Sequence, residues 1–107
     1  MVWQVSFYNN KVRKETLGLP AGILANLIRI IDLIEEFGPN LGLPHTAPMG
    51  NGLFEIRAKG PEGIGRSFFC IVKEEQVVIL HTIQKKTQKT PKGALTVARK
   101  RMKDIKS

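Results

Sequence analysis

The stretch LFEIRAKGPEGIGRSFFCIVKEEQVVILHTIQ, residues 53–84, decides the expected fold. Within it, residues 53–58 alternate between apolar and charged side chains, which is the period of a half-buried β-strand. Residues 64–72 and 77–84 are rich in β-branched and aromatic side chains, and the four residues between them suit a hairpin connection. The stretch therefore predicts a meander of three strands.

Outward from the meander, the sequence predicts one strand and two helices before it and one helix after it. Alternation predicts the strand, and apolar residues at helical spacing predict the helices, the longest of which stops at Gly38-Pro39. Residues 39–52 contain three prolines and three glycines, so we expect a structured loop there, with neither helix nor strand. The expected bounds are 3–7 for the strand, 11–17 and 22–37 for the first two helices, and 91 onwards for the last.

The order of one strand, two helices, three strands and one helix predicts an α+β domain. The chain has 107 residues, which is enough to bury one core but not two. Because no linker or low-complexity tract divides it, we expect a single domain over residues 1–107.

The net charge of the chain is +8, and the excess lies in its second half. Residues 1–51 carry four basic and four acidic side chains, whereas residues 52–107 carry thirteen basic and five acidic ones. A one-sided excess of this size favours an anionic partner, with nucleic acid first among the candidates. Composition alone leaves a merely soluble basic surface as the alternative.

Several classes of protein are not expected. Cys70 is the single cysteine and lies in an apolar run, so there is no disulfide framework, and no Cys and His cluster has metal-ligand spacing. The sequence also lacks a catalytic triad, paired carboxylates and a nucleotide-binding glycine loop, so we expect no metal and no cofactor. The N-terminus has no signal-peptide pattern and polar residues interrupt the apolar segment 23–34, so we expect a cytoplasmic protein that does not span a membrane.

The densest candidate feature is the run QKKTQKTP, residues 84–91. It lies where the last expected strand ends and the last helix begins, and its ammonium and hydroxyl groups could contact a phosphodiester backbone. A solvated turn is the alternative interpretation. The candidate residues of this run are Lys85, Lys86, Thr87, Lys89 and Thr90.

Further candidates lie on the neighbouring strands. Arg57 falls on the polar side of its strand beside Glu55, so a structural ion pair and a phosphate contact are equally open. Arg66 begins an otherwise apolar strand, where an arginine more readily clamps a phosphate or forms a salt bridge at an edge than packs in a core. Lys59 and, in the proline- and glycine-rich loop, His45 complete the set.

The chemistry that fits a cationic, metal-free site is narrow, and RNA fits it best because its own 2'-hydroxyl supplies the nucleophile. Arginine and lysine would neutralise the pentacoordinate phosphorane, and a lysine whose pKa is lowered by like-charged neighbours would act as base or acid. His45 is free to reach a substrate but has no visible carboxylate to orient it. His81 follows four apolar residues and is expected to be a hydrogen-bonded structural residue.

Several segments resemble the HigB-like branch of the RelE/ParE toxins, many of which are phage-derived. GLFEIR, residues 52–57, is similar to a strand motif of that branch, and Arg66 precedes the aromatic strand as it does there. LHTIQKKTQKTP, residues 80–91, is similar to the most specific run of the branch, and the basic segment 98–101 also fits. The resemblance covers nearly the full length. It implies the RelE-like fold, a small, mainly antiparallel sheet flanked by an N-terminal helical pair and a C-terminal helix.

The resemblance also implies a function. It implies an endoribonuclease toxin of a type II toxin–antitoxin system, an mRNA interferase that cuts mRNA on the ribosome without a metal. The partner would be an antitoxin, often of helix-turn-helix type. We assign catalysis to Arg57, Arg66 and Lys86, and RNA binding to Lys85, Lys89, Thr87, Thr90, Lys59 and His45.

Two points depart from this pattern or leave it open. Some relatives place a tyrosine, or a histidine and an aspartate, near the last helix, whereas the only tyrosine here is Tyr8 and no acid lies between Glu75 and Asp104. The general base is therefore left open. The same fold also serves ParE toxins that inhibit DNA gyrase, so gyrase inhibition and an inactive nucleic-acid-binding module are the alternatives.

Overall fold

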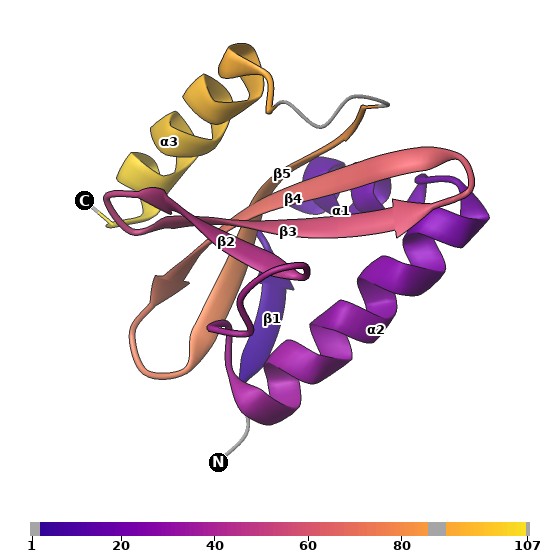
Figure 1. Ribbon diagram of the computed structural model, residues 1–107. Coiled ribbons are helices and arrows are strands. Elements are labelled where there is room, and N and C mark those ends of the chain that lie inside the picture. Colours follow the sequence, from indigo (N-terminus) through magenta and orange to yellow (C-terminus); the bar gives the residue numbers. More distant parts are fainter. Residues whose placement is uncertain (1–2, 86–89, 107) are drawn as a thin grey trace.

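The computed structural model describes residues 3–85 and 90–106, which form five strands in one sheet and three helices (Figure 1). The strands are β1 (Gln4–Phe7), β2 (Thr46–Gly50), β3 (Leu53–Gly60), β4 (Gly63–Val72) and β5 (Gln76–Lys85), and the helices are α1 (Asn10–Leu17), α2 (Ala21–Phe37) and α3 (Lys92–Lys106). The strands lie in the order β1-β5-β4-β3-β2. β1 pairs with β5 in parallel, and the other neighbouring pairs are antiparallel.

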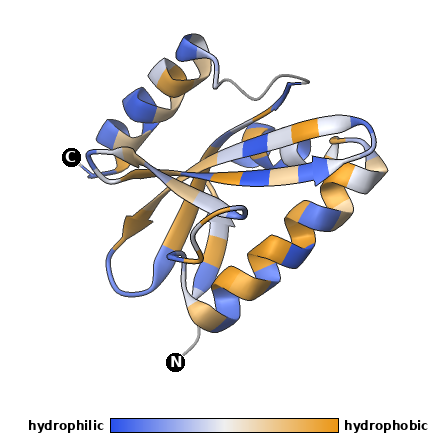
Figure 2. Ribbon diagram, viewed as in Figure 1, coloured by the Kyte–Doolittle hydropathy of each residue, from blue (hydrophilic) through white to orange (hydrophobic). Residues whose placement is uncertain are grey.

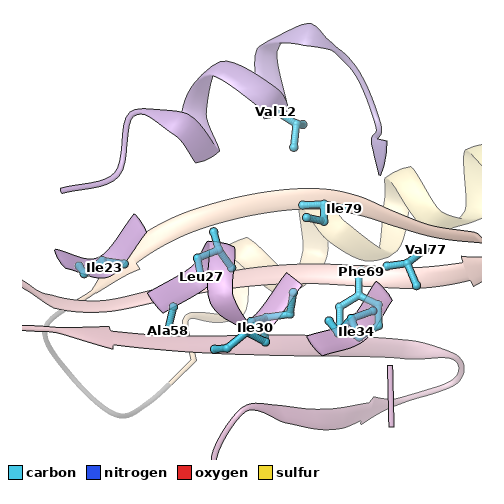
Figure 3. Packing of buried hydrophobic residues seen from close by; sticks show 10 residues of the cluster. Val12, Ile23, Leu27, Ile30, Ile34, Ala58, Phe69, Val77 and Ile79 are labelled. Carbon is cyan, nitrogen blue, oxygen red and sulfur yellow. The ribbon is translucent and has the colours of Figure 1, made fainter. Parts of the chain in front are cut away.

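One face of the sheet is closed by α1 and α2 over an apolar core (Figures 1 and 3). Figure 2 shows hydrophobic and hydrophilic residues interleaved along α2, as expected of an amphipathic helix. The buried stripe of α2, at most 1% exposed, consists of Ile23, Leu27, Ile30 and Ile34. The helix stops at Gly38, which has a φ of +93° and donates its backbone N–H to the carbonyl of Ile34 at 2.7 Å.

The turn between β3 and β4 caps the start of α2. Pro20 precedes this helix and makes no side-chain bond to its first turn. Glu62, in the turn, accepts a hydrogen bond at Oε2 from the backbone N–H of Gly22 at 3.0 Å, and this bond lowers the pKa of Glu62. Gly60 permits the close approach, because a Cβ there would lie 2.6 Å from the backbone nitrogen of Ile23.

The opposite face of the sheet is covered by α3 over only part of its extent. Two small residues, Ala94 and Ala98, bring α3 close to the sheet, where they pack with Leu53, Phe68 and Leu80 in a second apolar cluster. Figure 1 shows the β3–β4 hairpin extending past α3 on this face.

The expected α+β fold is confirmed, with one strand added. β2 lies within residues 39–52, so the expectation of a loop without any strand is wrong for residues 46–50. β2 is an edge strand, and its pairing with β3 is irregular between Pro48 and Gly50. Edges and bulges are the positions where a strand tolerates proline, so a strand of this composition gives no clear signal in the sequence.

Candidate nucleic-acid interface

Charged side chains gather on the part of the β3–β4 hairpin that extends past α3 (Figure 1). Along β3, Ile56 and Ala58 pack in the core beneath α2. Because successive side chains of a strand point to opposite faces, Glu55, Arg57 and Lys59 lie on the face that carries α3. Sequence alternation therefore assigned the charged side of this strand correctly.

The two strands next to β3 add further cations to this face. Arg66 on β4 pairs with Arg57, and antiparallel partners share a face. Lys85, the last residue of β5, lies two positions after Ile83, which packs in the cluster under α3. We call Arg57, Lys59, Arg66 and Lys85 the cationic face.

A buried carboxylate lies at the centre of this group. Glu55 is 0% exposed, and its Oε1 lies 2.6 Å from Nε of Arg57 and 3.3 Å from Nη1 of Arg66. Its other oxygen, Oε2, accepts a hydrogen bond at 2.8 Å from the hydroxyl of Thr90. One carboxylate thus meets two guanidinium groups, and the cluster keeps a net positive charge.

The two arginines of this cluster differ in access to solvent. The Arg57 side chain is 30% exposed, whereas that of Arg66 is 1% exposed. Arg66 was expected to clamp a phosphate or form a salt bridge at an edge rather than pack in the core, but it is buried on β4, the central strand, where it forms its salt bridge. Arg66 is a buried partner of Glu55, and Arg57 presents the accessible guanidinium. The ion pair between Arg57 and Glu55, one of the two possibilities open in the sequence, is confirmed.

Part of the basic run lies outside the described residues, namely Lys86, Thr87 and Lys89. The described positions on either side of it are Lys85, exposed at the end of β5, and Thr90, bound to Glu55 on β3. The structure therefore brings the beginning and the end of the run to the same face as Arg57.

The two histidines lie in different surroundings. The carbonyl of His45 accepts the backbone N–H of Arg57 at 2.8 Å, so this half-buried residue, just before β2, lies directly across from Arg57. His81 is on β5, and its Nδ1 is buried with no hydrogen-bond partner among the described residues, contrary to the hydrogen-bonded role expected for it. Burial, and secondarily the charge of Arg101, lowers the pKa of His81, which favours the neutral imidazole.

Tyr8 lies against the last helix, a placement that the sequence gave no reason to expect. Its hydroxyl donates a hydrogen bond to Oδ2 of Asp104 at 2.8 Å, and the guanidinium carbon of Arg101 lies 5.3 Å from the ring centroid. The hydrogen bond to Asp104 raises the pKa of Tyr8. The two residues are 96 positions apart, so no local pattern could have joined them.

Neither a metal centre nor a membrane span is found within the ranges 3–85 and 90–106. No group of three or more His, Cys, Asp or Glu side chains in these ranges is placed to hold a metal ion. None of the helices described there combines the length and the apolar character needed to cross a membrane.

Comparison with known proteins finds one family and several solved structures. The model of the family described as "Phage derived protein Gp49-like (DUF891)" matches residues 14–103. No curated protein matches the chain. Residues 14–103 include β2 to β5 and most of α3, so the match contains the whole cationic face.

The structural comparisons give the same fold as two RelE proteins. The archaeal RelE of a RelE–RelB complex from Pyrococcus horikoshii is 18% identical, with a TM-score of 0.58 over 83% of this chain and 100% of that one. A double arginine-to-alanine mutant of the Escherichia coli toxin RelE in the free state is 15% identical, with a TM-score of 0.60 over 95% of this chain and 99% of that one. The RelE-like fold implied by the sequence motifs is confirmed.

Proposed function

Because the chain belongs to the family of phage-derived Gp49-like proteins and has the fold of RelE, we propose that it is the toxin of a type II toxin–antitoxin system. We propose further that it is an mRNA interferase of the HigB-like type, an endoribonuclease that cuts mRNA held on the ribosome. The observation that carries this proposal is the cationic face, where an accessible Arg57 is fixed by a buried carboxylate beside a lysine-rich run.

Arg57 is the described residue best suited to bind a phosphate. Among the described residues it binds Glu55 through Nε at 2.6 Å, and 30% of its side chain is exposed. The two terminal nitrogens are then left for a ligand, and a planar guanidinium matches the oxygens of a phosphate. Donors fixed before the reaction stabilise the charge that develops on a phosphorane.

The remaining cations would act around this arginine. Arg66 would act from the interior, where it pairs with Glu55 and adds positive potential without touching RNA. Lys59 and Lys85 are exposed on the same face and would bind backbone phosphates. Of the residues outside the described ranges, Lys86 would serve as acid or base, and Thr87 and Lys89 would contact RNA.

The proposed reaction uses a nucleophile that RNA carries itself. The 2'-hydroxyl gives up its proton to a base and attacks the adjacent phosphorus. The bond to the 5'-oxygen of the next nucleotide breaks, and that oxygen takes up a proton. The products are a 2',3'-cyclic phosphate and a 5'-hydroxyl, and the step consumes no metal or cofactor. His45, across from Arg57, is close enough along the backbone to contact the same substrate.

We also propose an antitoxin as the protein partner. The archaeal relative was solved in a complex with RelB. An antitoxin of helix-turn-helix type would inactivate the present chain by covering or distorting the cationic face. The charge of that face makes an acidic segment the matching contact.

The test is brief expression of the protein with and without its neighbouring antitoxin candidate, followed by mapping of mRNA 5' ends. We expect new 5'-hydroxyl ends in translated regions, in phase with codons. Arg57→Gln should lower their yield by roughly 100-fold, since it removes a charged donor from the transition state. Arg13→Gln, which removes an exposed arginine from α1 on the opposite face, is the matched control and should cleave normally.

Other outcomes would refute the proposal. Intact mRNA together with DNA-damage signalling would indicate gyrase inhibition. Intact mRNA without such signalling, in a protein that still binds RNA, would indicate an inactive binding module. An assay with purified ribosomes separates ribosome-dependent cleavage from free ribonuclease activity.

A further inference from the structure

The carboxylate of Glu55 joins three segments that are distant in the sequence. Its Oε1 binds Arg57 on β3 and Arg66 on β4, and its Oε2 binds Thr90, just before α3. Glu55 is 0% exposed, so it cannot itself contact a polyanion in this conformation. Both of its oxygens are occupied by groups on the side of the sheet proposed to bind RNA.

The contact with Thr90 fixes where the basic run ends. Lys85 pairs with Ile64 on β4, and only residues 86–89 separate it from Thr90, which reaches Glu55 on β3. β4 lies between β5 and β3, so Lys85 on β5 and Glu55 on β3, the partner of Thr90, are two strands apart in the sheet. Glu55 is the side chain on β3 that binds Thr90.

We propose that Glu55 is a positioning residue that fixes the guanidinium of Arg57 relative to Thr90, just before α3. This inference rests on the proposed ribonuclease function. The same carboxylate holds Nε of Arg57 at 2.6 Å and the Thr90 hydroxyl at 2.8 Å, so the guanidinium and the end of the run share one anchor. The Thr90 hydroxyl holds the carboxylate, and the carboxylate holds the guanidinium that is proposed to meet the phosphate. Loss of that geometry slows the reaction even where all cations remain.

A purely structural role for the contact makes a different prediction. A contact that only stabilised the fold would change the free energy of unfolding and leave the kinetics of the folded enzyme intact. Loss of a residue that bound RNA directly would raise KM and change the dependence of binding on salt. Loss of a positioning residue lowers kcat and leaves the salt dependence of RNA binding unchanged, because no charged contact to RNA is lost.

Thr90→Val is the decisive variant, because it removes one hydroxyl, keeps the side-chain shape and leaves both arginine pairs in place. We expect kcat for ribosome-bound mRNA to fall roughly tenfold, as for a small misplacement of reacting groups. The salt dependence of binding to a non-cleavable 2'-deoxy oligonucleotide should be unchanged. Thr90→Ser, which restores the hydroxyl, should recover kcat. Glu55→Gln with Thr90→Val should be no slower than Glu55→Gln alone, because both act through one contact.

The opposite results would overturn the inference: a folded Thr90→Val enzyme with normal kcat, a Thr90→Ser enzyme as slow as Thr90→Val, or fully additive losses in the double variant. If the unaltered protein cleaves no mRNA, that result refutes the proposed function instead. Amide hydrogen exchange then tests the anchor independently. Faster exchange at residues 85–91 in Thr90→Val, restored in Thr90→Ser, would support it, and unchanged exchange would refute it.

Discussion

Both faces of the sheet carry an apolar cluster, but among the described residues only the face that carries α3 also buries an ion pair. Between the sheet and the helices α1 and α2, apolar side chains such as Ile30 of α2 and Phe69 of β4 are buried. These side chains need no specific partner to stabilise the fold. Beside α3 the sheet buries Glu55 and Arg66, which are tolerated only because they are paired. The face that is more demanding to build is also the one that presents Arg57. This difference is consistent with the proposed role of Arg57 in binding phosphate.

Breaking the buried pair should give the largest loss of stability. Glu55→Leu leaves Arg66 buried without its carboxylate, and we expect the free energy of unfolding to fall by about 3–5 kcal/mol. Urea unfolding measures this. The double variant Glu55→Leu/Arg66→Met makes this face resemble the other one and should recover most of the loss. If the double variant is no more stable than Glu55→Leu, the loss of the carboxylate beside Arg66 is not the cause.

A cavity in the opposite face should cost somewhat less and should not affect cleavage. Ile30 is 0% exposed in the core under α2, and Ile30→Ala should lower the free energy of unfolding by about 3 kcal/mol. At a temperature where the variant remains folded, mRNA cleavage should be that of the unaltered protein. Loss of cleavage by folded Ile30→Ala would show that the two faces do not have separate roles.

The smallest effect is expected at Glu62, the carboxylate that caps α2. Its pKa is lowered from the ordinary value of 4.5 by the N–H of Gly22, so its ionised form stabilises the fold above that value. The contribution is lost as the pH falls through the lowered pKa. Glu62→Gln should therefore melt below the unaltered protein at neutral pH, and the gap in Tm should narrow in acid. An equal gap at pH 7 and pH 3 would contradict the role of the charge.

The periodic elements could be predicted from the sequence because each carries its signal locally. The stripe of α2 and the alternation of β3 gave both the elements and the face on which Arg57 lies. β2 could not be predicted, since its pairing depends on β3 and its own residues include Pro48 and Gly50, which are unusual in strands. A short edge strand takes its structure from its neighbour.

Four of the residues proposed for the site share one face of the sheet, but the contacts between them and their neighbours could not be predicted. Arg57, Arg66, Lys59 and Lys85 lie on one face, as their grouping suggested. The sequence could not show that Arg66 is buried or that Thr90 meets Glu55, because exposure and contacts across 35 positions are decided by packing. For the same reason Tyr8 was regarded as remote from the last helix.

The parallel pairing of β1 with β5 determines when the sheet can be completed during synthesis of the chain. β1 can pair with β5 only after residues 76–79 have been made. The anchor at Thr90 and the contact between Tyr8 and Asp104 form later still, once residues 90 and 104 have been made. A nascent or prematurely terminated chain that stops before residue 90 lacks α3 and leaves the cluster of Leu53 and Phe68 uncovered. The proposed site is therefore complete only after Thr90 has been made.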